Sequence, residues 1–187
     1  NKDENIQNNQ ISNESEENNM YSTGKHHAEI VVKNYGTIAL ELDSDVAPIT
    51  VENFANLVNE GFYNGLTFHR IISGFMIQGG DPLGNGTGGS SKTIKGEFAS
   101  NGVKNSISHV RGTISMARSS MPNSASSQFF IVHQDSTFLD GKYAAFGTVT
   151  SGMEVVDKIC ADTAVEDDNG TVAKNNQPVI EKITIID

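Results

Sequence analysis

Apolar and polar residues alternate with a period of two over two stretches in the first quarter of the chain. The apolar positions of the two stretches are Ala28, Ile30, Val32, Ile38, Leu40 and Leu42. Residues 34–36, with the sequence Asn-Tyr-Gly, lie between the stretches and have turn-forming chemistry. A period of two on both sides of such a turn predicts a β-hairpin with one buried face.

Six further short runs have the composition of strands. They lie near residues 67–72, 75–79, 112–117, 128–132, 145–149 and 179–186. Together with the hairpin they give eight short strands, which is typical of a closed barrel or a sandwich.

Two segments have the 3.6-residue period of helices. Pro48 suits the first position of one helix, Gly61 suits its end, and the apolar stripe between them consists of Val51, Phe54, Ala55 and Val58. The second is expected to begin at Ser151, whose spacing to Glu154 matches a capping box, and its apolar face consists of Met153, Val156, Ile159 and Cys160. Two helices with eight strands favour a mainly β fold, a barrel whose open ends the helices cap.

Residues 1–25 differ in composition from the rest of the chain. They are rich in Asn, Glu and Ser, and their only large apolar residues are Ile6, Ile11, Met20 and Tyr21. Such a segment predicts a disordered polar tether, followed by one domain over residues 26–187. The chain starts at Asn1 without an initiator Met, so we expect that a segment upstream has been removed. The composition of residues 1–25 is similar to that of the spacer after the lipidated cysteine of bacterial surface lipoproteins, so we expect a membrane-tethered, extracytoplasmic lipoprotein with a lipid anchor before residue 1. The alternative is a cytoplasmic enzyme with a polar extension.

Charge and cysteine content narrow the classes of function. The net charge of −10 argues against a nucleic-acid partner, since phosphate binding requires clustered Lys and Arg. Cys160 is the only cysteine, and its apolar helical context predicts an inert buried thiol. The five histidines lack the spacing of metal ligands, so we expect neither a metal nor a cofactor.

Residues 67–81 contain the most informative cluster of side chains. Two short strands joined at residues 73–74 would aim Arg70, Phe75, Met76 and Gln78 into one pocket. None of these side chains is a nucleophile. A cationic donor beside an apolar surface suits a reaction in which no bond is broken, such as rotation about an X–Pro amide.

Three motifs resemble the cyclophilin family of peptidyl-prolyl isomerases. Residues 67–81 are similar to its FHRxIxGFMxQGGD signature, residues 115–131 to its SMA…SQFFI segment, and residues 138–147 to its (W/F)LDGK…FG segment. The resemblance covers roughly residues 28–186. It implies a closed, antiparallel, eight-stranded barrel and an enzyme that acts on X–Pro bonds of peptides and folding proteins.

The same resemblance assigns roles to single residues. Arg70 is implied to act on the prolyl amide, and Phe75 and Gln78 complete the catalytic set. The implied substrate-binding residues are Met76, Ala117, Arg118, Gln128, Phe130, Phe138, Leu139 and Tyr143. We expect a monomer. A module that binds proline-containing segments without turnover is the competing interpretation, and a hydrolase is disfavoured because no nucleophile motif is present.

Three positions depart from the vertebrate pattern of the family. Phe138 stands where many members have Trp, Tyr143 where many have His, and Arg118 where many have Asn. These choices resemble bacterial members and imply that cyclosporin binds weakly. Residues 84–89 match G-x-G-x-x-G, but no helix is expected after them, so we interpret them as a glycine loop and not as a dinucleotide site.

Overall fold

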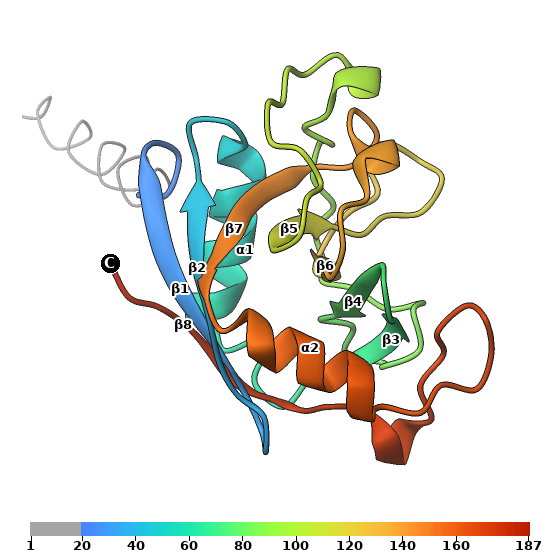
Figure 1. Ribbon diagram of the computed structural model, residues 1–187. Helices are drawn as coiled ribbons and strands as arrows, with labels where there is room; N and C mark the ends of the chain where they lie inside the picture. The colour runs from blue at the N-terminus through green and yellow to red at the C-terminus, as the bar shows by residue number, and fades with distance from the viewer. Residues whose placement is uncertain (1–19) are drawn as a thin grey trace, which may run out of the picture.

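The computed structural model describes residues 20–187, which contain one eight-stranded sheet and two α-helices (Figure 1). In chain order the elements are β1 (Lys25–Val32), β2 (Gly36–Asp43), α1 (Pro48–Asn59), β3 (Phe68–Ile72), β4 (Met76–Gly79), β5 (Thr113–Met116), β6 (Phe129–Val132), β7 (Ala145–Ser151), α2 (Met153–Asp162) and β8 (Ile180–Ile185). Three short 3₁₀ turns lie in the connections: η2 (Ala99–Asn101), η3 (Thr137–Leu139) and η4 (Lys174–Asn176). The strands and helices expected from the sequence are all present.

The predicted hairpin is formed by β1 and β2. Ile30 pairs with Ile38 and Ala28 with Leu40, and all four side chains are fully buried, so the period-two pattern marks the core face as expected. At the turn Asn34 has a φ of 67°, a left-handed conformation that asparagine tolerates better than most residues.

The sheet curls into a barrel whose two edge strands meet along a short seam. The strand order is β3-β4-β6-β5-β7-β2-β1-β8, and every neighbouring pair is antiparallel. Just before β3 and β8, Thr67 forms an isolated bridge with Val179, and the Phe68 N–H donates to the Pro178 carbonyl at 3.0 Å. The expected eight-stranded antiparallel barrel is therefore confirmed, with its closure made by a few hydrogen bonds and no full ladder.

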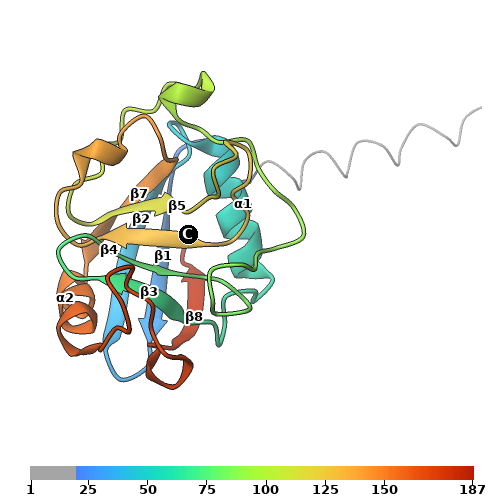
Figure 2. The ribbon, with the colours of Figure 1, turned by 90° about the vertical axis from the view of Figure 1, so that its right-hand side faces the viewer.

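Aromatic rings fill the interior of the barrel. Phe54 of α1 packs its ring 5.3 Å from Phe146, 5.7 Å from Phe129 and 5.3 Å from Tyr63. All four rings are completely buried. Figure 2 shows α1 and α2 on opposite sides of the barrel, where they cover its two openings.

The first turn of α1 is capped from a distant part of the chain. Its N-cap residue, Ala47, has no capping side chain, and the buried carboxylate of Glu97 accepts the Thr50 N–H and the Thr50 hydroxyl, both at 2.7 Å. The helix ends at Asn59, and after the C-cap residue Glu60 the chain turns away at Gly61, whose φ of 74° is the left-handed conformation that glycine adopts without strain.

The capping box expected at the start of α2 is wrong. Ser151 is the last residue of β7, and the N-cap residue is Gly152, with a φ of 94° and no side-chain hydrogen bond. A Cβ at Gly152 would collide with the Thr37 carbonyl. Close packing of α2 on β2 therefore decides the start of the helix. On the buried face of α2, burial raises the pKa of Cys160 to about 11, so its thiol is protonated at neutral pH, as an inert buried thiol should be.

The folded domain begins before the boundary expected at residue 26. Tyr21 is buried in the core, accepts the Ser44 hydroxyl on its carbonyl at 2.6 Å, and accepts the Asn59 side-chain amide on its own hydroxyl at 2.8 Å. Residues 1–19, which make up most of the predicted tether, lie outside the described residues. Between residues 20 and 187 no helix combines the length and the apolar character needed to span a bilayer.

Candidate active site

Strand β6 is buried on both of its faces. All four of its residues, with the sequence Phe-Phe-Ile-Val, are at most 5% exposed. Phe129 and Ile131 face the barrel core, whereas Phe130 and Val132 belong to a second apolar cluster with Met76 and Leu139. A strand buried on both faces has an uninterrupted apolar sequence. The second cluster therefore lies on the outer face of the sheet.

A β-bulge in β3 aims Arg70 at this outer cluster. The register of β3 on β4 shifts between Phe68 and Arg70, so His69 is the extra residue of the bulge. Phe68 consequently points into the core, while Arg70 lies on the outer face opposite Gln78 of β4. Gln78 in turn lies opposite Phe130 of β6. The guanidinium, the amide and the ring thus form one row across three strands.

This row lines a cavity of about 130 Å³. The cavity is lined by Arg70, Phe75, Met76, Gln78, Ala117, Arg118, Phe130, Leu139 and Tyr143. Every site residue expected from the sequence is in this set except Gln128 and Phe138. Three motifs that are far apart in the sequence therefore converge on one cavity.

The cavity has an apolar floor and aromatic sides. Met76, Phe130 and Leu139 are buried beneath it, and Phe75 and Tyr143 pack partly exposed against them. The Tyr143 ring meets the Phe130 ring edge to face at 5.8 Å. Such a slot can hold a small apolar ring by contact alone.

Phe138 contacts the slot only indirectly. Its ring packs 5.5 Å from the ring of Phe75 and is 65% exposed, and it does not line the cavity. Leu139, the next residue of η3, is buried and does line it.

The side chain of Arg118 forms one side of the cavity and packs against two aromatic rings. Its guanidinium lies 4.8 Å from the centre of the Phe98 ring and 4.9 Å from that of Tyr143. It donates to the Lys142 carbonyl from Nε at 3.0 Å and from Nη2 at 2.7 Å. The side chain of Arg118 thus holds Tyr143 in place.

Three hydrogen bonds fix the guanidinium of Arg70 at the mouth of the slot. Nε donates to the Asn169 carbonyl at 2.8 Å, Nη2 to the Asn169 side-chain oxygen at 3.2 Å, and Nη1 to Gln78 Oε1 at 3.1 Å. A guanidinium has five N–H groups, so two remain for a ligand. Burial lowers the pKa of Arg70 from its usual value, but an arginine remains charged in proteins.

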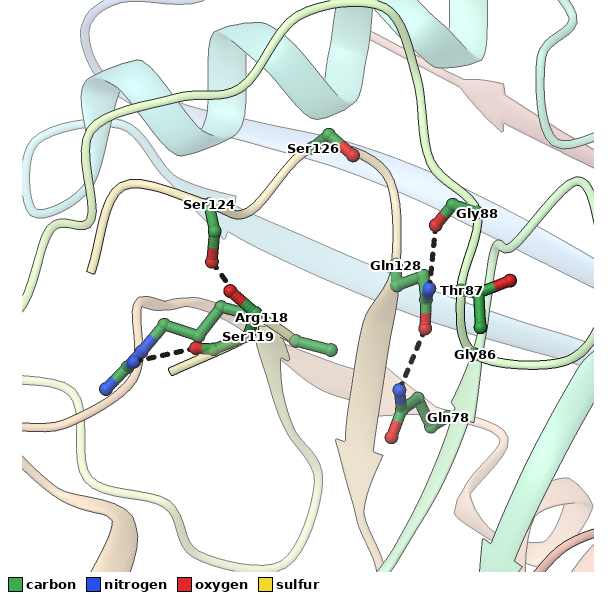
Figure 3. A pocket seen from close by; sticks show the side chains of 10 residues that line it. Gln78, Gly86, Thr87, Gly88, Arg118, Ser119, Ser124, Ser126 and Gln128 are labelled. Carbon is green, nitrogen blue, oxygen red and sulfur yellow. Dashed lines mark hydrogen bonds between the residues drawn. The ribbon is translucent and has the colours of Figure 1, made fainter. Parts of the chain in front are cut away.

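Gln78 and Gln128 continue the polar row into a second cavity of about 230 Å³ (Figure 3). Gln78 Nε2 donates to Gln128 Oε1 at 2.9 Å, and Gln128 Nε2 donates to the Gly88 carbonyl at 2.8 Å. The cavity is lined by Gln78, Gly86, Thr87, Gly88, Ala117, Arg118, Ser119, Ser124, Ser126 and Gln128. The two cavities share Gln78, Ala117 and Arg118, so they are neighbouring parts of one groove.

The glycine loop of residues 84–89 lines this groove, a role that the sequence did not indicate. No helix follows residues 84–89, as expected, and the buried carboxylate of Asp81 accepts the backbone N–H groups of Leu83, Asn85, Gly86 and Gly88 at 2.7–3.2 Å. Burial alone would raise the pKa of Asp81, but these four donors hold it below its usual range. Asp81 is the last residue of the signature, and its position directly before the loop was the available signal for this anchoring.

A buried histidine supports the slot from behind. His109 stacks on Phe130 at 5.9 Å, and its ring nitrogens lie 2.9 Å from Asp140 Oδ1 and 2.9 Å from Ser115 Oγ. Burial lowers the pKa of His109, with Asp140 opposing the shift. Nothing in the sequence distinguished His109 from the other histidines. Among residues 20–187, no group of three His, Cys, Asp or Glu side chains is arranged as a metal site.

Comparison with known proteins gives the family. Residues 27–186 match the family described as cyclophilin type peptidyl-prolyl cis-trans isomerase/CLD. A peptidyl-prolyl cis-trans isomerase of Helicobacter pylori is 51% identical over 128 residues, covering 67% of this chain and 76% of that protein. A probable peptidyl-prolyl cis-trans isomerase of Brucella suis is 46% identical over 158 residues, covering 78% of this chain and 76% of that protein.

A solved structure agrees with the sequence comparison. The crystal structure of a cyclophilin type isomerase of Cryptosporidium parvum superposes with a TM-score of 0.77 at 30% identity, covering 88% of this chain and 99% of that chain. The family match spans the barrel, both helices and all residues that line the slot. The chain therefore belongs to the cyclophilin-type peptidyl-prolyl cis-trans isomerases, and it is an enzyme of that class.

Proposed function

We propose that Arg70 catalyses rotation of the prolyl amide while the apolar slot holds the proline ring. The observation that carries the proposal is the pair of uncommitted N–H groups on a guanidinium fixed at the mouth of that slot. An N–H donated to the prolyl nitrogen withdraws its lone pair from the amide, and this weakens the partial double bond that opposes rotation. The amide barrier is about 18–20 kcal/mol, and a 10⁵-fold acceleration requires a reduction of roughly 7 kcal/mol.

The slot supports the proposal by its size and its chemistry. Its volume of about 130 Å³ is well below the roughly 300–1,000 Å³ of pockets for drug-sized ligands, so it suits a single side chain. Met76, Phe130 and Leu139 would fix the ring by contact while the preceding carbonyl turns. Only groups that bind the twisted amide better than the planar one accelerate the reaction.

The polar row beside the slot suits an extended peptide. Gln78 and Gln128 present amide groups along the groove, and the Ala117 backbone borders both cavities. The same isomerase of Cryptosporidium parvum was also crystallised in the presence of the dipeptide Ala-Pro, and that structure superposes with a TM-score of 0.76 at 32% identity. We therefore propose proline-containing peptides and folding proteins as substrates, bound by a monomer because one chain supplies the whole site.

The test is a protease-free NMR exchange measurement on an X–Pro peptide with wild type, Arg70→Ala and Arg70→Lys. Arg70→Ala should lower kcat/KM at least tenfold with an unchanged circular dichroism spectrum. Arg70→Lys should recover little, because a point charge does not replace the guanidinium fork. Lys182→Ala, which removes an exposed cation of β8, is the control and should match wild type. Near-wild-type turnover by folded Arg70→Ala would refute the role of Arg70.

For the location of the enzyme, the proposal rests on composition alone. The Asn-, Glu- and Ser-rich residues 1–19 resemble spacers that follow a lipidated cysteine, so we propose an extracytoplasmic, membrane-tethered lipoprotein. Cells that make the protein would be fractionated with and without a block of lipoprotein processing. Recovery of the full-length chain in the cytosol under both conditions would support the cytoplasmic alternative instead.

A further inference from the structure

The turn that carries Phe75 is held by a side chain outside the groove. Strands β3 and β4 are joined by residues 73–75, and the only backbone bond within this turn runs from the Phe75 N–H to the Ile72 carbonyl at 2.9 Å. Ser73 and Gly74 are exposed. Phe75 lines the slot immediately after them, so any loosening of the turn moves one side of the slot.

His133 forms two hydrogen bonds with this turn. It follows β6 directly, where its backbone N–H donates to the Phe75 carbonyl at 2.8 Å. Its side chain adds a second bond, because Nδ1 lies 2.8 Å from the Gly74 backbone nitrogen. A backbone N–H only donates, so Nδ1 must be the unprotonated nitrogen that accepts.

The far side of the ring fixes this tautomer. His133 Nε2 lies 3.0 Å from Asp157 Oδ1 of α2. Arg111 donates to both carboxylate oxygens of Asp157 at 2.7 Å and holds the pKa of Asp157 below its usual range. An ionised carboxylate only accepts hydrogen bonds, so Nε2 carries the proton and Nδ1 keeps its lone pair for Gly74.

We propose that His133 is a positioning residue of the isomerase, which holds Phe75 against the slot by accepting the Gly74 N–H at Nδ1, in a tautomer set by Asp157 and Arg111. The proposal rests on the proposed role of the slot. It does not depend on what Arg70 does, because His133 touches neither Arg70 nor the cavity.

Two substitutions distinguish the role of the accepting nitrogen, Nδ1, from that of the rest of the His133 ring. In His133→Asn the amide oxygen can occupy the place of Nδ1, whereas in His133→Gln the amide nitrogen can replace Nε2 and no acceptor remains for Gly74. NMR exchange on an X–Pro peptide should give His133→Gln a three- to tenfold lower kcat/KM, mainly through a higher KM, as expected for one hydrogen bond. His133→Asn should stay within about twofold of wild type.

The Gly74 amide reports the bond directly. Its hydrogen exchange should be faster in His133→Gln than in wild type and little changed in His133→Asn. His27→Gln is the control, since His27 lies on β1 and pairs with Glu41 and Asp187.

Three results would overturn the proposal. The first is equal kcat/KM for the Gln and Asn variants, whether both fall or neither does. The second is unchanged Gly74 exchange in His133→Gln. The third is a lower thermal midpoint with unchanged kcat/KM, which would make His133 structural only. If folded Arg70→Ala keeps near-wild-type turnover while the His133 variants behave as expected, the proposed role of the slot stands and only that of the guanidinium is refuted.

Discussion

At the scale of single residues, we expect Phe138 to affect drug binding more than substrate binding. Its ring packs against Phe75, is largely exposed and does not line the slot, so we expect substrate to need only the apolar surface that Phe138 already gives. Cyclosporin-sensitive members of the family carry Trp at this position, whose indole adds area and one N–H donor. Phe138→Trp should therefore strengthen cyclosporin binding about three- to tenfold, in line with about 0.5–1.5 kcal/mol for one hydrogen bond, and change turnover little.

Calorimetric titration with cyclosporin and exchange kinetics on the same protein samples would measure both effects. Phe138→Leu keeps an apolar residue without an aromatic ring, and it should not gain affinity. A flat affinity with a sharp rise in turnover would contradict the position of Phe138 outside the slot.

Most residues of the site could be found from the sequence because short motifs carry them. Arg70, Phe75 and Gln78 fall in one run of 15 residues, and the predicted pair of strands with its connecting turn brings them near each other. Asn169 could not be found, because its contact with Arg70 is made through a loop 99 positions further along the chain. The roles of Arg70, Phe75 and Gln78 in catalysis stay predictions.

At the scale of secondary structure, α1 depends on a carboxylate supplied by another part of the chain. Glu97 is 2% exposed and accepts two hydrogen bonds from Thr50 in the first turn of the helix. Glu97→Ala leaves these donors buried without a partner and removes a negative charge from the positive end of the helix dipole. We expect a loss of about 2–4 kcal/mol in the free energy of unfolding.

Urea denaturation followed by circular dichroism measures this loss. Glu181→Ala, which removes an exposed acid from β8, is the matched control and should change the free energy by less than about 0.5 kcal/mol. Equal stability of the Glu97 and Glu181 variants would show that α1 does not need the cap.

Periodicity predicted where the strands and helices lie, but not how they end or bend. The apolar run over 128–132 was assigned as a strand, and its burial on both faces explains why it has no alternation. The bulge at His69 leaves no mark in the sequence, because it arises from pairing with β4. The false capping box at Ser151 has the same kind of cause, since close packing against Thr37 favours Gly152 as the N-cap.

At the scale of the whole molecule, two buried histidines make stability depend on pH. Burial lowers the pKa of His69, with Asp81 opposing the shift, and burial lowers that of His109, with Asp140 opposing it. Both groups bind protons more readily in the unfolded chain. Stability is therefore full above the ordinary histidine pKa of 6.5 and is lost progressively as the pH falls towards the lower folded values.

Urea unfolding at pH 7.5 and about pH 5 tests this dependence. The free energy of unfolding should be smaller at the lower pH, and His109→Gln should reduce the difference. His27→Gln, at a site that is about 42% exposed, is the surface control for the substitution itself. A difference that His109→Gln does not alter would assign the pH dependence to other groups.

The start of the folded domain gives a prediction about truncation. Removing residues 1–19 leaves every described contact of Tyr21 in place, so thermal midpoint and turnover should be unchanged. Tyr21→Ala removes a buried ring and the hydrogen bond from Asn59, and it should cost roughly 3–5 kcal/mol. Calorimetry on the two proteins would decide, and an unchanged midpoint for Tyr21→Ala would return the boundary to residue 26.

The strand order also determines when the enzyme can fold during its own synthesis. Among the strands of residues 20–187, β1 is the first to be made and β8 the last. The two lie side by side, and the seam of the barrel needs Val179 just before β8. While the ribosome is still translating, β1 has only β2 beside it, and its other edge stays open to any passing chain. This isomerase therefore completes its own barrel only after the codon for Ile185 has been read.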